Sequence, residues 1–287
     1  MQTTLLRTLL AIQETGSFTA AAEAVRLSHS AVSIQMKQLE QQLGAALFIK
    51  GRRPAVLTPL GEEITDKARE IINQLDDLKS LAGADDVGGK VTLGFVPTTL
   101  QNLLPVALER LREEFPKLQV SVRSGLSDQL VAGVENREID FAFLSAPVSA
   151  HFMVALHEIG AEPLFVVTAK DNTSQEREAD ILQQNPYIAF SRNTWLGEQI
   201  SNHLIQQGLS LEPAIELDSM DAIEHLVARG FGVSIVPQRL LAAPLEESLR
   251  CLPLGSPAPV RRVMLATPRH CRRQSLLDCL TSIAADK

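Results

Sequence analysis

Two short helical segments separated by a break stand near the start of the chain, and they constrain the fold of this region more than any other feature. The stretch TAAAEAVRLSHSAVSIQMKQLEQQLG (19–44) has three consecutive alanines before the break. Because alanine adds little bulk, the first segment can cross the second at short range. Ser28 can cap the second segment through its side-chain oxygen. Apolar residues then recur at spacings of 4, 3 and 4, as on one buried helix face: Val32, Met36, Leu39 and Leu43.

The side of the second segment that points away from this apolar stripe is small, polar and singly basic. At about 100° per residue it holds Ser30, Ile34 and Lys37, with His29 and Ser33 close by. Hydroxyls can reach base edges or phosphates, a lysine can neutralise a phosphate, and an apolar side chain can contact a thymine methyl group. These residues are the candidate DNA-reading face. An ordinary solvated helix face is the alternative.

The next stretch, LFIKGRRPAVLT (47–58), predicts a small β-ribbon with a basic tip that carries Arg52 and Arg53. Such a wing can lie along the DNA backbone or in the minor groove. From Met1 to Thr58 there are six lysines and arginines against three acidic residues, although the whole chain has a net charge of -7. A locally basic head on an acidic body suits DNA binding at one end, since only the surface near the phosphates matters.

Residues 16–63 resemble the winged helix-turn-helix of the LysR-type transcriptional regulators. An ordered set of positions carries the resemblance: Phe18, Ala21, Ala22, Ser30, Ala31, Val32, Ser33, Gln35, Leu39, Glu40, Leu43, Gly44, Leu47, Phe48, Arg52, Arg53, Leu57, Thr58 and Gly61. Members often have glutamine where this chain has His29, and a more polar residue where it has Ile34. The resemblance implies double-stranded DNA as a partner. The two departures leave the preferred operator sequence open.

A long amphipathic helix is predicted after the wing. Apolar residues recur along it at helical spacing: Leu60, Ile64, Ala68, Ile71, Leu75, Leu78 and Ala82. An isolated helix of this length needs a partner for its apolar stripe. The resemblance implies that it dimerises, in a homodimer or a homotetramer, and packing onto the second domain is the alternative. The polar segment from Gly83 to Lys90 is typical of a flexible hinge.

From Val91 onward, strand-like and helix-like segments alternate, which predicts an α/β domain with a largely parallel sheet. The resemblance implies an effector-binding domain with the two-lobed fold of periplasmic binding proteins, joined by strands that cross near 161–168 and 264–267. The predicted division of the chain is a winged helix-turn-helix (1–58), a linker helix (59–83), a hinge (84–90), and lobe I (91–162 and 268–287) with lobe II (163–267).

In parallel sheets, ligands bind beyond the carboxyl ends of the strands, where helix N-termini present free amides. The resemblance implies a small, often anionic effector between the lobes. The matching positions in this chain are Thr98, Thr99, Ser145, Arg192, Phe231 and Gly232. The threonines can offer hydroxyls and amides, and Arg192 can pair with a carboxylate through two hydrogen bonds. A threonine can equally cap a helix, and an arginine can equally be a surface residue.

No catalytic or metal-binding pattern stands out in the sequence. The six histidines form no i, i+4 pair, there is no phosphate-binding glycine loop, and Cys251, Cys271 and Cys279 are expected to be reduced thiols. No apolar run approaches the roughly 20 residues of a membrane helix, and the N-terminus does not match a signal peptide. We therefore expect a cytoplasmic regulator that is no enzyme and uses no cofactor, with RNA polymerase as a partner if it activates. A solute-binding module whose head docks on a protein is the alternative, and an enzyme is a more distant one.

Overall fold

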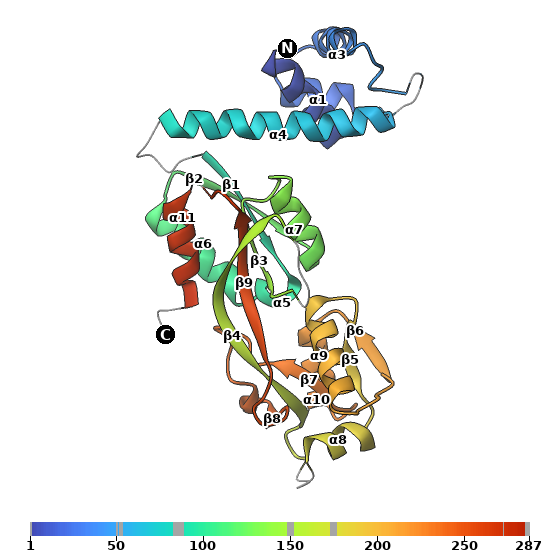
Figure 1. Ribbon diagram of the computed structural model, residues 1–287, viewed down its shortest axis with the longest axis vertical. Helices are drawn as coiled ribbons and strands as arrows, with labels where there is room; N and C mark the ends of the chain where they lie inside the picture. Colours follow the sequence, from blue (N-terminus) through green and yellow to red (C-terminus); the bar gives the residue numbers. More distant parts are fainter. Residues whose placement is uncertain are drawn as a thin grey trace. The chain divides into compact units, whose positions relative to one another are not determined.

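The computed structural model describes residues 2–49, 51, 54–82, 89–147, 152–172, 177–271 and 273–284. The chain forms two compact units, here called the head (Met1–Asp86) and the body (Val87–Lys287). The described part of the head is mainly helical, whereas the body combines a mixed β-sheet with helices (Figure 1).

The predicted helix pair and the predicted cap at Ser28 are confirmed in the head. The described helices there are α1 (Thr3–Thr15), α2 (Phe18–Ala24), α3 (His29–Leu43) and α4 (Pro59–Ala82). The Ser17 hydroxyl accepts hydrogen bonds from two amides at the start of α2, and the Ser28 hydroxyl accepts one from the Ala31 amide at the start of α3. Ala21 and Ala22 are buried in the head's core, as their small size allows.

A short antiparallel bridge between Phe48 and Leu57 forms the stem of the predicted β-ribbon. The Ile49 amide donates a hydrogen bond of 2.9 Å to the Val56 carbonyl and extends this pairing by one step. The basic residues predicted at its tip lie outside the described residues: Lys50, Arg52 and Arg53.

The first half of α4 belongs to the core of the head itself. Thr65, Ala68 and Ile72 are buried, and the helix packs against α1. Ile71, which the sequence pattern placed on the same stripe as Ala68, is 39% exposed. Ile64, Ala68 and Leu75 of the predicted stripe do pack in the head core, but between them Ile72 and not Ile71 is buried. Residues 83–88 of the predicted hinge lie outside the described residues, and Gly89 and Lys90 begin β1.

The main sheet of the body is mixed and not largely parallel as predicted. Its strand order is β2-β1-β3-β9-β4-β7, with β8 paired to β4. Only β1 is parallel to its neighbours, β2 and β3, because β9 returns antiparallel between β3 and β4. The strands are β1 (Gly89–Phe95), β2 (Leu118–Ser124), β3 (Phe141–Ser145), β4 (Val154–Ala169), β7 (Ser234–Pro237), β8 (Leu249–Pro253) and β9 (Val260–Pro268), beside a separate parallel pair, β5 (Ile188–Phe190) and β6 (Ile215–Leu217).

The body's helices flank these strands. They are α5 (Pro97–Leu100), α6 (Leu103–Glu114), α7 (Ser127–Glu135), α8 (Glu178–Gln184), α9 (Trp195–Gln206), α10 (Met220–Ala228) and α11 (Gln274–Thr281), with the 3-10 turns η1 (Leu245–Glu247) and η2 (Ser282–Ala284). α5, α6, α7 and α11 lie with β1, β2 and β3 in a first lobe. α8, α9 and α10 lie with β5, β6 and β7 in a second lobe (Figure 1).

Two long strands, β4 and β9, run through both lobes (Figure 1). Residues 154–163 of β4 pair with β9, and residues 164–169 pair with β7 and β8. Residues 263–266 of β9 pair with β3 in the first lobe, so β9 crosses between the lobes near 260–262 and not at the predicted 264–267.

Each lobe has its own hydrophobic core. The second-lobe core gathers around Ile188, Ile223 and Ile235. In the first lobe the side chains of β3 alternate between two clusters, with Phe141 and Phe143 in one and Ala142 and Leu144 in the other. This period of two is the expected pattern for a strand covered on both faces.

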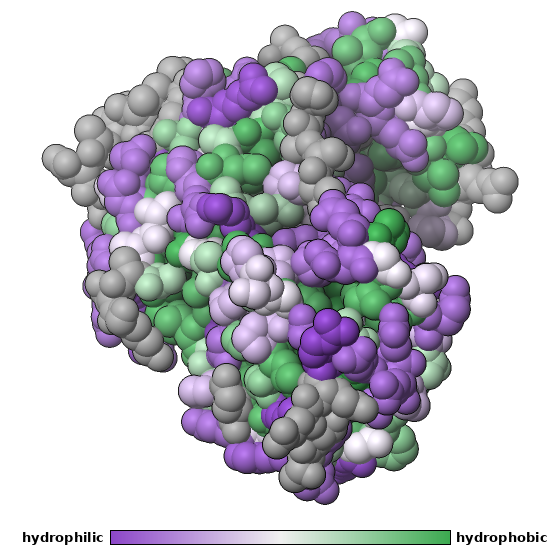
Figure 2. Space-filling view, turned by 60° about the horizontal axis from the view of Figure 1, so that its bottom comes forward, coloured by the Kyte–Doolittle hydropathy of each residue, from purple (hydrophilic) through white to green (hydrophobic). Residues whose placement is uncertain are grey.

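The surface mixes hydrophilic and hydrophobic residues on the face drawn in Figure 2. Among the described residues, the large apolar side chains with the greatest exposure are Ile205, Ile34, Met153 and Phe231. In the part of the chain that the structure describes, no helix has the length and apolar character needed to cross a membrane.

Candidate functional sites

The predicted DNA-reading face lies on the outside of α3. Ser30, Ile34 and Lys37 are exposed, and Ile34 keeps 65% of its surface accessible. His29 is exposed beside them with its ring 6.3 Å from that of Phe18, and Ser33 is half-buried. An exposed isoleucine in the middle of a polar face is available for an apolar contact such as a thymine methyl group.

The opposite side of α3 is fixed by packing and by hydrogen bonds to the side chains of Gln35 and Glu40. Val32, Met36 and Leu39 are at most 2% exposed, whereas Leu43, which the spacing placed on the same buried stripe, is 37% exposed at the end of the helix. The Gln35 amide oxygen accepts a hydrogen bond of 2.6 Å from the Thr8 hydroxyl of α1. The Glu40 carboxylate accepts one of 2.8 Å from the Leu47 amide, where the wing begins. The resemblance marked Gln35 and Glu40 only as shared positions. Their local sequence gave no sign that they join α3 to α1 and to the wing.

The wing and α4 meet at Gly61. The Thr58 hydroxyl donates to the Ala46 carbonyl and accepts from the Gly61 amide, both at 2.9 Å. A Cβ atom on Gly61 would stand 2.3 Å from the Leu47 carbonyl oxygen. Glycine at this position is therefore required for the close approach of α4 to the wing.

In the body, the predicted effector residues Thr98 and Ser145 come together around a buried arginine. Arg261, on β9, has no exposed surface. Its Nη2 donates to the Thr98 hydroxyl at 2.7 Å, its Nε to the Ser145 hydroxyl at 2.9 Å, and its Nη1 to the Glu162 carboxylate at 2.9 Å. The second oxygen of Glu162 accepts a hydrogen bond of 2.8 Å from the Leu240 amide.

This network explains how a charged pair survives in the interior. Glu162 and Arg261 are direct cross-strand partners on β4 and β9, and each is at most 1% exposed. Burial lowers the pKa of the Arg261 guanidinium from its ordinary value, and the charge and hydrogen bond of Glu162 oppose this shift. The attraction between Glu162 and Arg261 therefore favours the charged form of both. Arg261 also donates hydrogen bonds to the Thr98 and Ser145 hydroxyls, which were expected to face an effector.

Thr99 has a local role in the same region. Its hydroxyl donates a hydrogen bond of 2.9 Å to the Val96 carbonyl at the start of α5, and the residue is 1% exposed. Thr98, Thr99 and Ser145 thus all have hydrogen-bond partners inside the protein. Arg261 and Glu162 were missed from the sequence, since nothing local links two residues separated by 99 positions.

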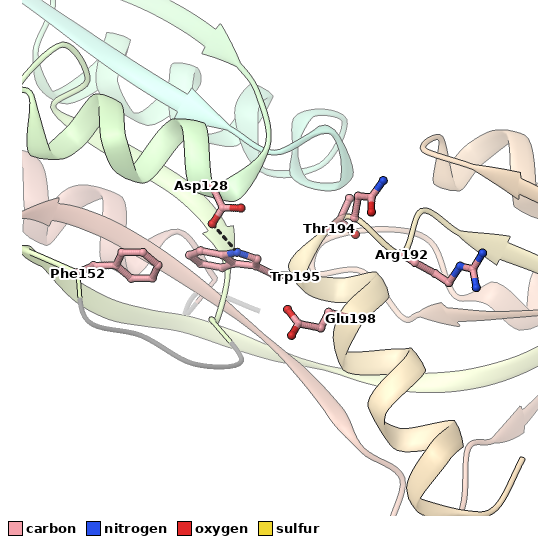
Figure 3. Close-up of a pocket in the computed structure, with 7 residues that line it drawn as sticks. Asp128, Phe152, Arg192, Thr194, Trp195 and Glu198 are labelled. Carbon is pink, nitrogen blue, oxygen red and sulfur yellow. Dashed lines mark hydrogen bonds between the residues drawn. The ribbon is translucent and has the colours of Figure 1, made fainter. Parts of the chain in front are cut away.

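A cavity of about 300 Å³ lies at the junction of the two lobes (Figure 3). Asp128, on α7 of the first lobe, and Phe152, just before β4, form one side. The turn before α9 and its first residues form the other. The lining residues are Asp128, Phe152, Arg192, Asn193, Thr194, Trp195 and Glu198.

Arg192 is the one predicted effector residue that lines this cavity, and its charged group is already paired. Its Nε donates to the Glu216 carboxylate at 3.2 Å, and its backbone amide donates to the other oxygen of that carboxylate at 3.0 Å. The amide hydrogen bond and the charge of Arg192 lower the pKa of Glu216. In Figure 3 the guanidinium group points away from Asp128 and Trp195.

Phe231 and Gly232 are not among the residues that line the cavity. Phe231 is 58% exposed, and Gly232 has φ 158°, where a Cβ atom would stand 2.2 Å from the Pro186 carbonyl oxygen. Gly232 therefore allows a close backbone approach between two segments of the second lobe. No group of three or more histidines, cysteines and acidic residues that could hold a metal ion occurs among the residues described.

Two family models match the chain, and together they cover nearly all of it. The model "Bacterial regulatory helix-turn-helix protein, lysR family" matches residues 3–62, and the model "LysR substrate binding domain" matches residues 84–287. The second match alone spans more than half of the chain.

Curated relatives are regulators of transcription. The chain is 26% identical over 234 residues to the HTH-type transcriptional regulator CzcR of Bacillus cereus, covering 81% of this chain and 79% of the relative. It is 25% identical over 285 residues to a hydrogen peroxide-inducible genes activator of Dickeya chrysanthemi, covering 95% and 92%.

Solved structures share the fold. A full-length OxyR variant from Pseudomonas aeruginosa matches with a TM-score of 0.78 at 22% identity, covering all of this chain and 95% of that one. Full-length CbnR in complex with its target DNA matches with a TM-score of 0.66 at 20% identity, covering 99% of both. Because the two family models span nearly all of the chain, the chain belongs to the LysR family: it is a DNA-binding transcriptional regulator with an effector-binding domain, and it is not an enzyme.

Proposed function

We propose that the chain reads DNA with the exposed face of α3 and alters its DNA binding when a small molecule occupies the cavity between the two lobes of the body. The observation that carries the first part is the fixed α3 helix, which leaves Ser30, Ile34 and Lys37 exposed. In this proposal Ser30, Ser33, Ile34 and Lys37 contact the major groove and its phosphates, while Arg52 and Arg53 hold the flanking backbone.

Lys37→Ala is expected to weaken binding to all DNA sequences alike. The substitution removes one phosphate contact, so the slope of log affinity against log salt should become shallower by about 0.9. Fluorescence anisotropy with labelled duplexes at several salt concentrations measures this. Lys90→Ala removes the same charge from an exposed position on β1 and should leave the slope unchanged. A Lys37→Ala slope equal to that of the wild type would contradict the phosphate contact.

The rival function is a head that docks on another protein. Retention of fragmented host DNA on the purified chain at physiological salt separates the two. Enrichment of a short inverted repeat supports sequence-specific reading. Weak retention that does not change with salt supports the docking head, because phosphate contacts make DNA binding salt-dependent.

A dimeric arrangement would fit the inverted repeat. Among the side chains of α4 that the structure describes, Leu60 and Ile71 stay exposed, at 46% and 39%, although the first half of the helix packs against α1. These side chains support association with α4 of a second copy, in a homodimer or homotetramer, whose symmetry would set the half-site spacing.

An anionic effector would meet charged and polar groups that already have partners inside the protein. A carboxylate held by Arg192 would have to displace Glu216 from it. It could not use the hydroxyls of Thr98 and Ser145 unless Arg261 released them. What supports a small molecule is the size of the cavity and its position between two lobes that β4 and β9 join.

Peroxide is not expected to act on this chain through Cys271 or Cys279. Burial raises the pKa of the Cys271 thiol, and burial with the nearby Glu114 raises the pKa of Cys279 to about 11. The thiolate is the reactive form, so both thiols should be inert near neutral pH. In a Cys251→Ser variant, which leaves only these two of the three cysteines, DNA binding should therefore be the same before and after treatment with hydrogen peroxide, and mass spectrometry should find both thiols unoxidised. Oxidation of either thiol together with altered DNA binding would contradict this.

The same pKa shift has a consequence for stability. Because folding raises the pKa of Cys279 above its ordinary value of 9.0, the folded state binds this proton more tightly than the unfolded state. This tighter binding of the proton adds to the free energy of unfolding. The addition is fully present below pH 9.0 and is lost as the pH rises towards about 11. In a Cys279→Ala variant the loss of stability across this interval should be smaller than in the wild type.

A further inference from the structure

Trp195 belongs to the second lobe by sequence and to the first lobe by packing. It is the first residue of α9, and the following residue, Leu196, lies in the second-lobe core. Trp195 itself is 8% exposed and belongs to a hydrophobic cluster built otherwise from the first lobe and the crossing strands. The other buried members are Val96, Leu130, Val131, Val134, Ile139, Ala142, Leu144 and Ala266. Adjacent residues of one helix thus enter two different cores.

The first-lobe side also binds the polar edge and one face of the ring. The indole Nε1 donates a hydrogen bond of 2.8 Å to the Asp128 carboxylate at the start of α7. Phe152 stacks on the ring with centroids 5.3 Å apart and planes inclined by 21°. Figure 3 shows Phe152 beside the indole and Asp128 above it, joined to its nitrogen by the hydrogen bond. Each element of the ring's chemistry, its flat apolar face and its N–H donor, therefore has a partner in the first lobe.

The turn that presents the ring is rigid. The Thr194 hydroxyl accepts from the Gly197 amide at 3.0 Å and donates to the Ser191 carbonyl at 2.8 Å. A Cβ atom on Gly197 would lie 2.0 Å from that same carbonyl oxygen, so the turn and α9 are in direct backbone contact. Because the ring is held by a fixed turn, it is expected to leave the first lobe when the lobes separate.

We propose that the first lobe carries a binding pocket for a flat apolar ring with an N–H donor, and that Trp195 occupies it as an internal ligand that keeps the lobes together. The proposal rests on the function given above, in which the cleft takes a small molecule. An effector with such a ring then takes over the stacking and the hydrogen bond of Trp195. The side chain of Trp195 leaves the pocket, and the lobes are no longer held together by it. Because Trp195 is part of the same chain, it competes with the effector for the pocket at a high effective concentration. An effector must bind the pocket strongly enough to overcome this competition.

The charges around the cavity favour a ligand that brings a hydrogen-bond donor over one that brings an acceptor. The Asp128 carboxylate accepts the indole hydrogen bond, and Glu198 lines the same cavity. The Arg192 guanidinium, the cation on the lining, is bonded to Glu216. A ligand that brings its own carboxylate would meet two like charges here, whereas an N–H group meets an acceptor.

The pocket is tested with a matched pair of probes, indole and its carbon analogue indene, which has no N–H group. Full-length Trp195→Ala should bind indole about tenfold more tightly than indene, the effect of one hydrogen bond to a charged group. In Trp195→Ala/Asp128→Ala the two probes should bind equally. The wild type, whose pocket is filled, should bind both more weakly. Since Trp195 is the only tryptophan, the emission of bound indole can be followed directly in both variants.

Equal binding of indole and indene to Trp195→Ala would overturn the proposal, and so would equal binding of indole to that variant and the wild type. A second measurement keeps the test valid if Trp195→Ala does not fold. Acrylamide should quench Trp195 several-fold more in Asp128→Ala than in the wild type, while Asp128→Asn, which retains an acceptor oxygen, should resemble the wild type. Equal quenching in the wild type, Asp128→Ala and Asp128→Asn would show that the hydrogen bond to Asp128 does not hold Trp195 in the first lobe. Neither measurement uses DNA, so a failure of the regulatory function is seen separately, as loss of DNA binding.

Discussion

Replacement of Arg261 by alanine is expected to lower the free energy of unfolding of the body by about 3–5 kcal/mol, which is the usual cost of removing one partner of a buried ion pair. The truncation leaves the Glu162 carboxylate buried without its counter-charge, although the Leu240 amide still donates to it. It also removes the donors to the Thr98 and Ser145 hydroxyls. Denaturant unfolding followed by the emission of Trp195 reports on the body alone.

The adjacent residue provides a matched control. Arg262 also forms an ion pair, with Glu158, but its side chain is 57% exposed. Arg262→Ala should cost less than about 1 kcal/mol, because exposed ion pairs contribute little. The double variant Arg261→Met/Glu162→Leu should be more stable than Arg261→Ala, since it leaves no unpaired charge. Similar costs for Arg261→Ala and Arg262→Ala would show that the buried network does not stabilise the body.

Gly61→Ala is expected to abolish DNA binding through the fold of the head. Glycine to alanine inside a helix ordinarily gains about 0.5–1 kcal/mol. Here the added methyl group would stand 2.3 Å from the Leu47 carbonyl oxygen and 3.1 Å from its carbon, so the sign should reverse. A loss of several kcal/mol is expected, because backbone and not a flexible side chain must move. The change displaces the start of the wing, to which Glu40 of α3 is also bonded.

This result is measured as duplex affinity by anisotropy and as head unfolding by circular dichroism. Glu63→Ala, an exposed position in the same turn of α4, is the control and should alter neither by much. The emission of Trp195 should be unchanged in Gly61→Ala, which shows that the body is intact. Wild-type DNA affinity in Gly61→Ala would mean that the wing can shift without loss of function.

The head could be predicted well from the sequence because its determinants are local. The cap at Ser28 and the stripe of Val32, Met36 and Leu39 lie within a few residues of the elements they define. The exposed face of α3 follows from the same periodicity. Ile71 was misplaced because the pattern of α4 alone does not show which side α1 covers.

The body could be predicted only in outline. The alternation of strands and helices was correct, but the return of β9 between β3 and β4 depends on residues more than 100 positions apart. The hydroxyls of Thr98 and Ser145 were correctly placed near strand ends. Their partner, Arg261, is 163 and 116 residues away in sequence, and Trp195 is 67 residues from Asp128. Such pairs are set by topology, which a single sequence pattern does not encode.

The burial of Thr65, Ala68 and Ile72 in the head has a practical and a mechanical consequence. A fragment that stops at Thr58 would lack part of its own interior, so the smallest stable DNA-binding fragment must extend at least through Ile72. For the same reason α4 is not a passive tether. Because its first half is packed into the same core as α3, any rotation of α4 about its axis carries the proposed DNA-reading face of α3 with it.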